Sequence, residues 1–210
     1  MATKSPASQC HLDPVNFDDE EQFTELQRQR LACGWDHDSR ILQKWKQKQQ
    51  ENLKSLFWIA VPSTSTEKSN TAIRAGHIAL DAYCDPLDPD PAAQTSPSFF
   101  ILPEYRSHGL GRRAMQLVEG LAVREPYGSP RCRVVALTAL SKRYLYDEGP
   151  EWRGLWARIG EAMPSFSIQE WYENLGYSSW KEEVLYEVTT LDGQVIRLWE
   201  AFMRKEVQLT

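Results

Sequence analysis

The spacing of hydrophobic and polar residues predicts that the chain begins with two helices. Behind an acidic first turn, an apolar stripe is formed by Phe23, Leu26 and Leu31, and Gly34 is placed to end the helix. Asn16 or Asp18 can cap its start, because short polar side chains accept hydrogen bonds from the first backbone N–H groups.

The second helix is expected to start at Asp36 or Asp38. From there Ile41, Leu42 and Trp45 share one face, and a lysine- and glutamine-rich stretch follows that reads as solvated surface. The chain therefore places two amphipathic helices before its first strand.

Short apolar runs bounded by proline, glycine and polar residues predict three strands in the middle of the chain. Two long polar segments between them read as loops. The strands are expected at residues 56–61, 73–80 and 98–102, and the loops at residues 63–71 and 85–97. The first two strands should be antiparallel neighbours.

The C-terminal half returns to helical spacing and then ends in two strands. The expected elements are helices at residues 109–124 and 168–175, a strand at 133–140, and a hairpin of strands 179–189 and 195–206. Aromatic and charged residues mix over residues 142–167, which we interpret as an insertion with one short helix at 152–162. This order of elements predicts a mixed α/β fold.

Length and composition limit the class of protein. With 210 residues, 41% of them hydrophobic, we expect one domain over residues 11–210 after a disordered lead at 1–10. A formal net charge of -5 argues against a nucleic-acid partner. No apolar run of about 18 residues and no signal segment occur. We therefore expect no membrane partner and a location in the cytoplasm, with the nucleus as an alternative.

The four cysteines, Cys10, Cys33, Cys84 and Cys132, are scattered along the chain. No Cys-x-x-Cys pair occurs, and no histidine lies near them at the spacing of zinc ligands. We therefore expect reduced thiols, an intracellular compartment and no metal site.

The strongest chemical signal is a strand that runs through a glycine-bearing turn into an amphipathic helix. The sequence from Phe99 to Arg113 is FFILPEYRSHGLGRR. The first N–H groups of a helix have no partner within it and lie at the positive end of its dipole. Gly109 and Gly111 allow close approach of a phosphate oxygen, and Arg112 adds positive charge. The segment predicts an anion site whose natural ligand is a pyrophosphate, although it lacks the Gly-Lys-Ser/Thr ending of a nucleotide P-loop.

A second motif follows on the last expected helix, where residues 171–177 read WYENLGY. Together with RSHGLG at residues 106–111, it resembles the GNAT superfamily of N-acetyltransferases, which shares an R/Q-x-x-G-x-G/A motif and an aromatic-Tyr-Glu-x-Leu-Gly-aromatic segment. The likeness covers nearly the whole chain apart from residues 142–167. It implies a GNAT-like acyl-CoA N-acyltransferase fold, an α/β (α+β) fold with a mixed, mostly antiparallel central sheet and helices on both faces.

The resemblance implies that the chain binds acetyl-CoA as a co-substrate. Backbone amides after the central strand would hold the pyrophosphate, and the strand edge would pair with the pantetheine amides. The implied cofactor-binding residues are Phe99, Phe100, Ile101, Arg106, Ser107, His108, Gly109, Leu110, Gly111 and Arg112. The backbone N–H near Ile101 could polarise the thioester carbonyl.

The resemblance also implies that Tyr172 is the acid that protonates the coenzyme A sulfur. The structural alternative is that Tyr172 only packs beside Trp171. Both alternatives place an aromatic side chain on the last helix, and they differ in what the hydroxyl group does.

The general base does not follow from the motifs. Family members place a glutamate near the start of the central strand, at about the position of Thr95 here. His77 is a candidate base because its pKa can lie near the working pH, and a packed, hydrogen-bonded histidine is the alternative. Asp81 and the acidic loop after it could attract a cationic amine, and a water chain could replace the base.

The acceptor side departs from the family pattern, because Ser165 stands where an asparagine is common. The aromatic residues of the insertion could form a lid over a small amine, or they could be the local core of the insertion. These residues are Tyr144, Tyr146, Trp152 and Trp156.

The expected activity is direct transfer of acetyl from acetyl-CoA to a primary amine of a small molecule, in a ternary complex. One alternative is a catalytically silent acyl-CoA-binding module, which the missing glutamate favours and Tyr172 argues against. A second is a protein lysine or N-terminal acetyltransferase, which would need an open groove. A homodimer is the assembly we consider.

Overall fold

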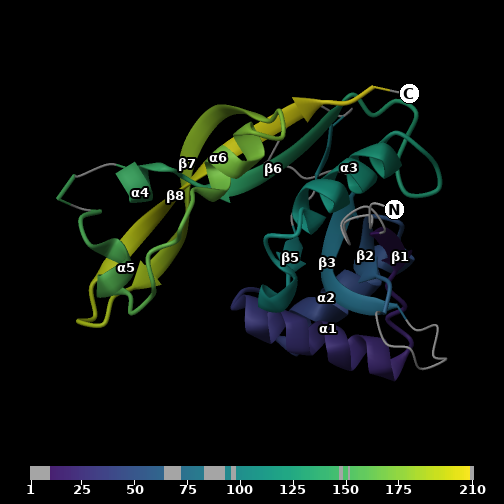
Figure 1. Cartoon of the computed structure of the whole chain (residues 1–210), viewed down its shortest axis with the longest axis horizontal. Helices are drawn as coiled ribbons and strands as arrows, with labels where there is room; N and C mark the ends of the chain where they lie inside the picture. Colours follow the sequence, from purple (N-terminus) through teal and green to yellow (C-terminus); the bar gives the residue numbers. More distant parts are fainter. Residues whose placement is uncertain are drawn as a thin grey trace, which may run out of the picture. The chain divides into compact units, whose positions relative to one another are not determined.

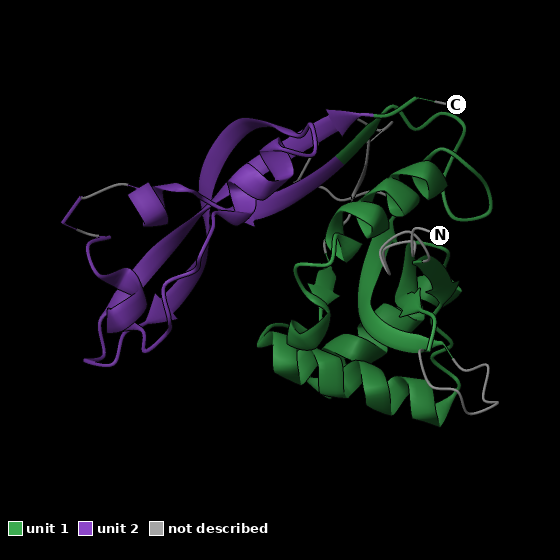
Figure 2. Ribbon diagram, viewed as in Figure 1, with its two compact units in different colours: residues 1–135, 207–210 green, residues 136–206 purple. Residues whose placement is uncertain are grey.

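The computed structural model describes residues 10–63, 72–82, 93–95, 98–146, 149–150 and 152–208. The chain divides into two compact units, residues 1–135 with 207–210 and residues 136–206, which Figure 2 shows in two colours. Almost all of the expected disordered lead lies outside the described residues, as do Cys84 and most of the expected loop at 63–71. No helix within the described ranges combines the length and the apolar character that crossing a membrane requires.

The first unit carries a mostly antiparallel sheet and three longer helices (Figure 1). Strand β2 pairs antiparallel with β1 and β3, and β3 also pairs antiparallel with β5 and, at one position, with β4. The strands are β1 (His11–Pro14), β2 (Lys54–Val61), β3 (Ile73–Asp81), β4 (Ala93–Thr95) and β5 (Phe99–Ile101), and the helices are α1 (Glu20–Cys33), α2 (Ser39–Gln50) and α3 (Leu110–Ala122).

Helices cover both faces of this sheet. Leu26 of α1 and Leu42 of α2 are fully buried in one cluster with Leu56, Trp58 and Ala79, so α1 and α2 cover that face. Side chains alternate along a strand, so Phe57 lies on the opposite face, where α3 packs (Figure 1). The fold class expected from the sequence is confirmed here.

The helix ends follow the capping signals closely. Asp19 caps α1 by accepting hydrogen bonds from two backbone N–H groups, one residue after the expected Asp18. Gly34 ends α1 in the left-handed conformation at φ 83°, and Asp38 caps α2, both as expected. The error of one residue is of the size that short polar runs produce, because several side chains in them can serve as the cap.

Two predictions in this unit are wrong. Leu31, expected in the apolar stripe of α1, is 67% exposed. The segment 85–97 was expected to be loop throughout, but Ala93–Thr95 forms strand β4 and pairs with β3 at Asp81 and Thr95. A three-residue strand has too few positions to show alternation, and it is stabilised by its neighbour in the sheet rather than by its own sequence.

The second unit consists of a sheet and three short helices. Strand β6 (Val134–Leu140), which leads into this unit, lies next to β8, and β8 pairs antiparallel with β7 as the expected hairpin. The remaining elements are α4 (Arg143–Tyr146), α5 (Leu155–Arg158), α6 (Ile168–Glu173), β7 (Ser178–Thr189) and β8 (Val195–Glu206). The insertion thus contains two helices of four residues each, where one longer helix was expected.

Three of the four aromatic residues of the insertion, Tyr144, Trp152 and Trp156, form a local core with the hairpin, whereas Tyr146 is 62% exposed. Tyr144 is 5% exposed and packs with Leu155, Ile196 and Leu198, while Trp152 contributes from the rim. The Tyr144 hydroxyl accepts a hydrogen bond from the backbone N–H of residue 199 at 2.6 Å and donates to the carbonyl of residue 197 at 3.2 Å. It therefore satisfies two backbone groups of β8 beyond the point where β6 ends.

Candidate functional site

The proposed anion loop lies between β5 and α3. The 3-10 turn η2 (Pro103–Tyr105) ends the extended segment, and α3 begins after Gly109, which has φ 77° and no side-chain cap. Ser107 also has a positive φ, 64°, so two left-handed residues lie two positions apart. Such alternation turns successive backbone N–H groups toward one point and forms a concave anion site.

The first backbone N–H groups of α3 have no hydrogen-bond acceptor within the helix. The first intrahelical bond of α3 runs from the N–H of Arg113 to the carbonyl of Gly109 at 3.1 Å. The N–H groups of Leu110 and Gly111 precede that bond, so they have no acceptor within the helix. The first turn contains no acidic residue, and Arg112 adds positive charge there. The loop can therefore hold a dianionic group through its backbone.

Arg106, the first residue of the motif, turns back toward β5. Its Nε donates to the carbonyl of Ile101 at 2.9 Å, and its guanidinium lies 5.6 Å from the centre of the Phe100 ring. The side chain is exposed, so the guanidinium remains open to solvent beside the loop. Arg106 thereby joins the strand to the start of the anion loop.

The two edges of β5 differ in their hydrogen bonding. In its antiparallel pairing with β3, the N–H of Leu102 donates to the carbonyl of Ala75, and the carbonyl of Ser98 accepts from Ala79. Residues that bond to the neighbouring strand alternate with residues that face away, so the N–H of Ile101 points away from β3. Ile101 thus offers a backbone donor on the edge of β5 that, by the family resemblance, would face the thioester.

His77 lies opposite Phe100 on β3 and is fully buried. Its Nδ1 lies 2.9 Å from Gln29 Oε1, and its Nε2 lies 3.3 Å from a guanidinium nitrogen of Arg30. Burial, with the charges of Arg30 and Lys54, lowers the pKa of His77 to about 3. These surroundings favour the packed, hydrogen-bonded alternative that the sequence left open.

Tyr172 lies in the second unit, on α6. It is 6% exposed and makes edge-on ring contacts with Trp171 and Tyr177, with ring centres 4.8 and 5.6 Å apart. Burial raises the pKa of its phenol, so the hydroxyl stays protonated throughout the neutral range. The packing expected for the structural alternative is present, and the protonation state also suits an acid.

Other candidate groups are already engaged. Asp81 is buried and pairs with the buried Lys54 at 2.7 Å, so it does not offer an open carboxylate to an amine. Within the described ranges, no group of three or more histidine, cysteine, aspartate or glutamate side chains is placed to hold a metal ion.

Sequence reasoning missed three buried polar residues. Gln29 and Arg30 lie at the third and fourth positions after Leu26, on the apolar face of α1. Glu200 lies on the buried side of β8, where burial raises the pKa of its carboxyl to about 7. The signal available was a polar residue at a position where the period of the element requires an apolar one.

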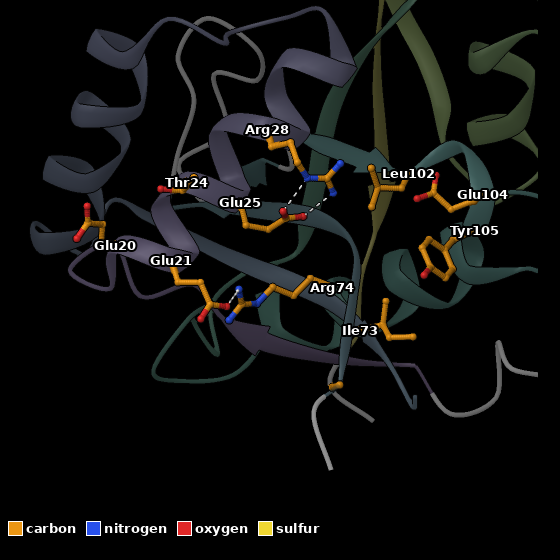
Figure 3. Close-up of a pocket in the computed structure, with 11 residues that line it drawn as sticks. Glu20, Glu21, Thr24, Glu25, Arg28, Ile73, Arg74, Leu102, Glu104 and Tyr105 are labelled. Atoms are coloured by element: carbon orange, nitrogen blue, oxygen red, sulfur yellow. Dashed lines mark hydrogen bonds and ion pairs between the residues drawn. The ribbon is translucent and has the colours of Figure 1, made fainter. Parts of the chain in front are cut away.

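One hollow in the described part of the first unit has a volume of about 690 Å³ (Figure 3). Four glutamates and two arginines line it, and the arginines are paired within it, Arg28 with Glu25 at 2.7 Å and Arg74 with Glu21 at 3.0 Å. The excess of carboxylates repels phosphate groups, so this hollow is poorly suited to hold a diphosphate.

The second unit contains a smaller pocket of about 470 Å³ within the insertion. Tyr144, Trp152 and Trp156 form its aromatic wall, and Arg153 and Glu161 are its charged lining residues. The aromatic side chains thus belong to a core on one side and line a hollow on the other.

The antiparallel sheet with helices and the strand-loop-helix junction define the class: the fold is that of the GNAT acyl-CoA N-acyltransferases. A spermidine N-acetyltransferase chimera, partly from Vibrio cholerae, is similar at a TM-score of 0.60 and 10% identity, covering 94% of this chain and 95% of that one. An aminoglycoside 6'-N-acetyltransferase complexed with coenzyme A is similar at a TM-score of 0.53 and 12% identity, covering 95% and 98%.

The NatC complex bound to Gag peptide and coenzyme A is a third similar structure, at a TM-score of 0.57 and 12% identity, covering 95% of this chain and 99% of that one. No protein-family model matches the chain, and no curated protein sequence matches it significantly. At such low identity the likeness establishes the fold, and the activity has to be argued from the site.

Proposed function

We propose that this chain is an N-acetyltransferase that transfers the acetyl group of acetyl-CoA to a primary amine. The observation that carries the proposal is the loop from Ser107 to Arg112, which combines two left-handed residues with the start of α3. Solved structures with the same fold contain coenzyme A, which supports the same co-substrate here.

In the proposed reaction the amine nitrogen attacks the thioester carbonyl carbon, and the carbon–sulfur bond breaks. The N–H of Ile101, on the outer edge of β5, would stabilise the negative charge on the carbonyl oxygen. Tyr172, which burial keeps protonated, would give its proton to the departing thiolate. The proton of the amine would leave through a water chain, because the neutral, enclosed His77 is poorly placed to accept it.

For the acceptor we propose a small-molecule primary amine. The similar structures include enzymes named for spermidine and for an aminoglycoside, which are polyamines or carry several amino groups. One complex with the same fold binds a peptide, so a protein acceptor is the alternative outcome of the test below. A homodimer and a cytoplasmic location remain predictions.

The direct test is binding followed by turnover. Calorimetry with acetyl-CoA should give saturable binding, and S-acetylpantetheine, which lacks the diphosphate, should bind much more weakly because the loop then has no ligand. A thiol-release assay with polyamines, aminoglycosides, amino acids and peptides should then identify the acceptor class. Equal affinity for the two thioesters would contradict the assignment of the loop, and binding without turnover on any amine would favour the silent module.

A further inference from the structure

Strand β3 contains a bulge directly beside the exit of β5. Ile59 of β2 faces Gly76, but the next residue, Ala60, faces Arg74, so Ala75 is an extra residue in the ladder. The carbonyl of Ala75 accepts the N–H of Leu102 at 3.0 Å, and Leu102 is the first residue after β5. Bulges bend a strand and redirect its neighbours, so this bulge helps to set where the chain leaves β5.

The side chain of Gln29 spans this bulge from α1. Its amide nitrogen donates to the carbonyl of Arg74 at 2.9 Å and to Glu25 Oε1 at 2.8 Å, and its Oε1 lies 2.9 Å from Nδ1 of His77. Gln29 is fully buried. Both amide hydrogens and the amide oxygen therefore have partners, and one of those partners lies on each side of the extra residue.

The protonation pattern of His77 follows from these contacts. A guanidinium can only donate, so Nε2 of His77 accepts from Arg30 and Nδ1 carries the proton that is donated to Gln29. The charged groups around the ring are Arg30 of α1 and Lys54 of β2, and Lys54 is paired with Asp81 of β3. His77 is thus a neutral link between α1 and β3.

The same segment of β3 is in tight contact with β5. A Cβ atom added at Gly76 would lie 2.2 Å from the carbonyl oxygen of Phe100, and the rings of His77 and Phe100 have centres 5.7 Å apart. With no room between the strands, a shift of residues 74–77 must move β5 and the start of the anion loop with it.

We propose that Gln29 and His77 are positioning residues for acetyl-CoA: they fix the bulge of β3 and thereby hold the exit of β5 and the loop that follows it. This inference rests on the proposed function. It assigns His77 a role that needs no proton transfer, and it adds a residue of α1 to the binding machinery although α1 contributes no group to the loop itself.

The test compares Gln29→Met with Leu26→Ala. Gln29→Met keeps the size of the side chain and removes its hydrogen bonds, whereas Leu26→Ala destabilises the same helix without touching the bulge. In calorimetry, Gln29→Met should weaken acetyl-CoA binding roughly tenfold, the scale of one buried hydrogen-bonded group. Leu26→Ala should stay within about twofold of wild type when both are measured well below their melting temperatures.

A second variant separates positioning from proton transfer. Glutamine can accept from Arg30 and donate to Gln29, so His77→Gln should keep its turnover and the pH profile of kcat within about threefold. A general base would lose most of its kcat on this change. Should Gln29→Met fail to fold, Gln29→Glu removes both amide donors, to Arg74 and to Glu25, keeps the acceptor for His77, and should weaken binding in the same direction.

Three outcomes have distinct meanings. Equal acetyl-CoA affinity in the Gln29→Met and Leu26→Ala variants overturns the inference, and so does loss of turnover in His77→Gln with binding intact. If the wild-type chain itself does not bind acetyl-CoA, the proposed function fails instead.

Discussion

The two compact units differ in the kind of group that each offers for binding or catalysis. In the first unit the anion loop is exposed and consists of backbone N–H groups, whose direction is set by Ser107 and Gly109. In the second unit the candidate groups are single side chains, Tyr172 and Glu200, which are buried in a packed core. Backbone N–H groups do not titrate and are removed only by substitution with proline, while buried side chains can be altered one atom at a time.

This difference indicates where each kind of evidence will be found. Substitutions in the loop should act through backbone conformation, so the residue type matters mainly where φ is positive. Substitutions in the second unit should act through hydroxyl and carboxyl groups, so pH and isosteric changes are the informative variables. The comparison can be tested with one variant that removes a hydroxyl, one that strains the loop and one that removes a charge.

The largest effect is expected for Tyr172→Phe. If the phenol protonates the departing thiolate, kcat should fall about a hundredfold or more, with the affinity for acetyl-CoA unchanged. Steady-state kinetics over a wide pH range, together with calorimetry, measures both quantities. Tyr177→Phe removes a hydroxyl from the same aromatic cluster and should leave kcat within about threefold. Full turnover in Tyr172→Phe would reduce Tyr172 to a packing residue.

The next largest effect is expected for Gly109→Val. At φ 77° a β-branched residue is strongly disfavoured, so the first turn of α3 must rearrange and acetyl-CoA binding should weaken about a hundredfold. Calorimetry measures the change. The matched control is Ser107→Gly, which places the permissive residue at φ 64° and should bind at least as tightly as wild type. A similar loss of acetyl-CoA affinity in both variants would mean that binding does not depend on the left-handed backbone conformation of the loop.

The smallest effect is expected for Glu200→Gln, and it depends on pH. Burial raises the pKa of this carboxyl from 4.5 to about 7, so the folded state favours the neutral form. Its contribution to stability is complete below pH 4.5 and is lost as the pH rises through 7. The free energy of unfolding of Glu200→Gln should therefore match wild type near pH 4.5 and exceed it by about 2 kcal/mol near pH 9.

Chemical denaturation at the two pH values measures that difference. Glu206→Gln, at the exposed end of the same strand, is the control and should show no gain at high pH. A pH-independent effect of Glu200→Gln would show that the carboxyl is stabilised by contacts rather than penalised by burial.

Much of the fold could be predicted because local signals agree with tertiary structure. Asp38 and Gly34 mark helix ends through bonding and φ preferences that act within a few residues. Strand β4 and helix α4 could not be predicted, and α5 lies within the helix expected at 152–162 but is shorter. Elements this short have no measurable period and depend on contacts with distant residues.

The candidate site was predictable to a similar extent. Gly109 was singled out because glycine lets a phosphate oxygen approach the backbone closely, but its left-handed conformation was not predicted, and serine gives no indication of the positive φ at Ser107. The environment of His77 could not be predicted from the sequence. Gln29 and Arg30 lie 48 and 47 residues away in sequence and approach His77 only after α1 packs on β3. Whether Tyr172 is an acid stays a prediction.

The phenol of Tyr144 has a further consequence for the hairpin. A strand with open N–H and C=O groups along one side is a template on which another polypeptide can add itself. The Tyr144 hydroxyl bonds the carbonyl of residue 197 and the N–H of residue 199 on β8, just past the end of β6. These two groups are therefore not available to pair with an incoming strand. In this stretch of β8, the pairing of two backbone groups therefore depends on one hydroxyl group of the insertion.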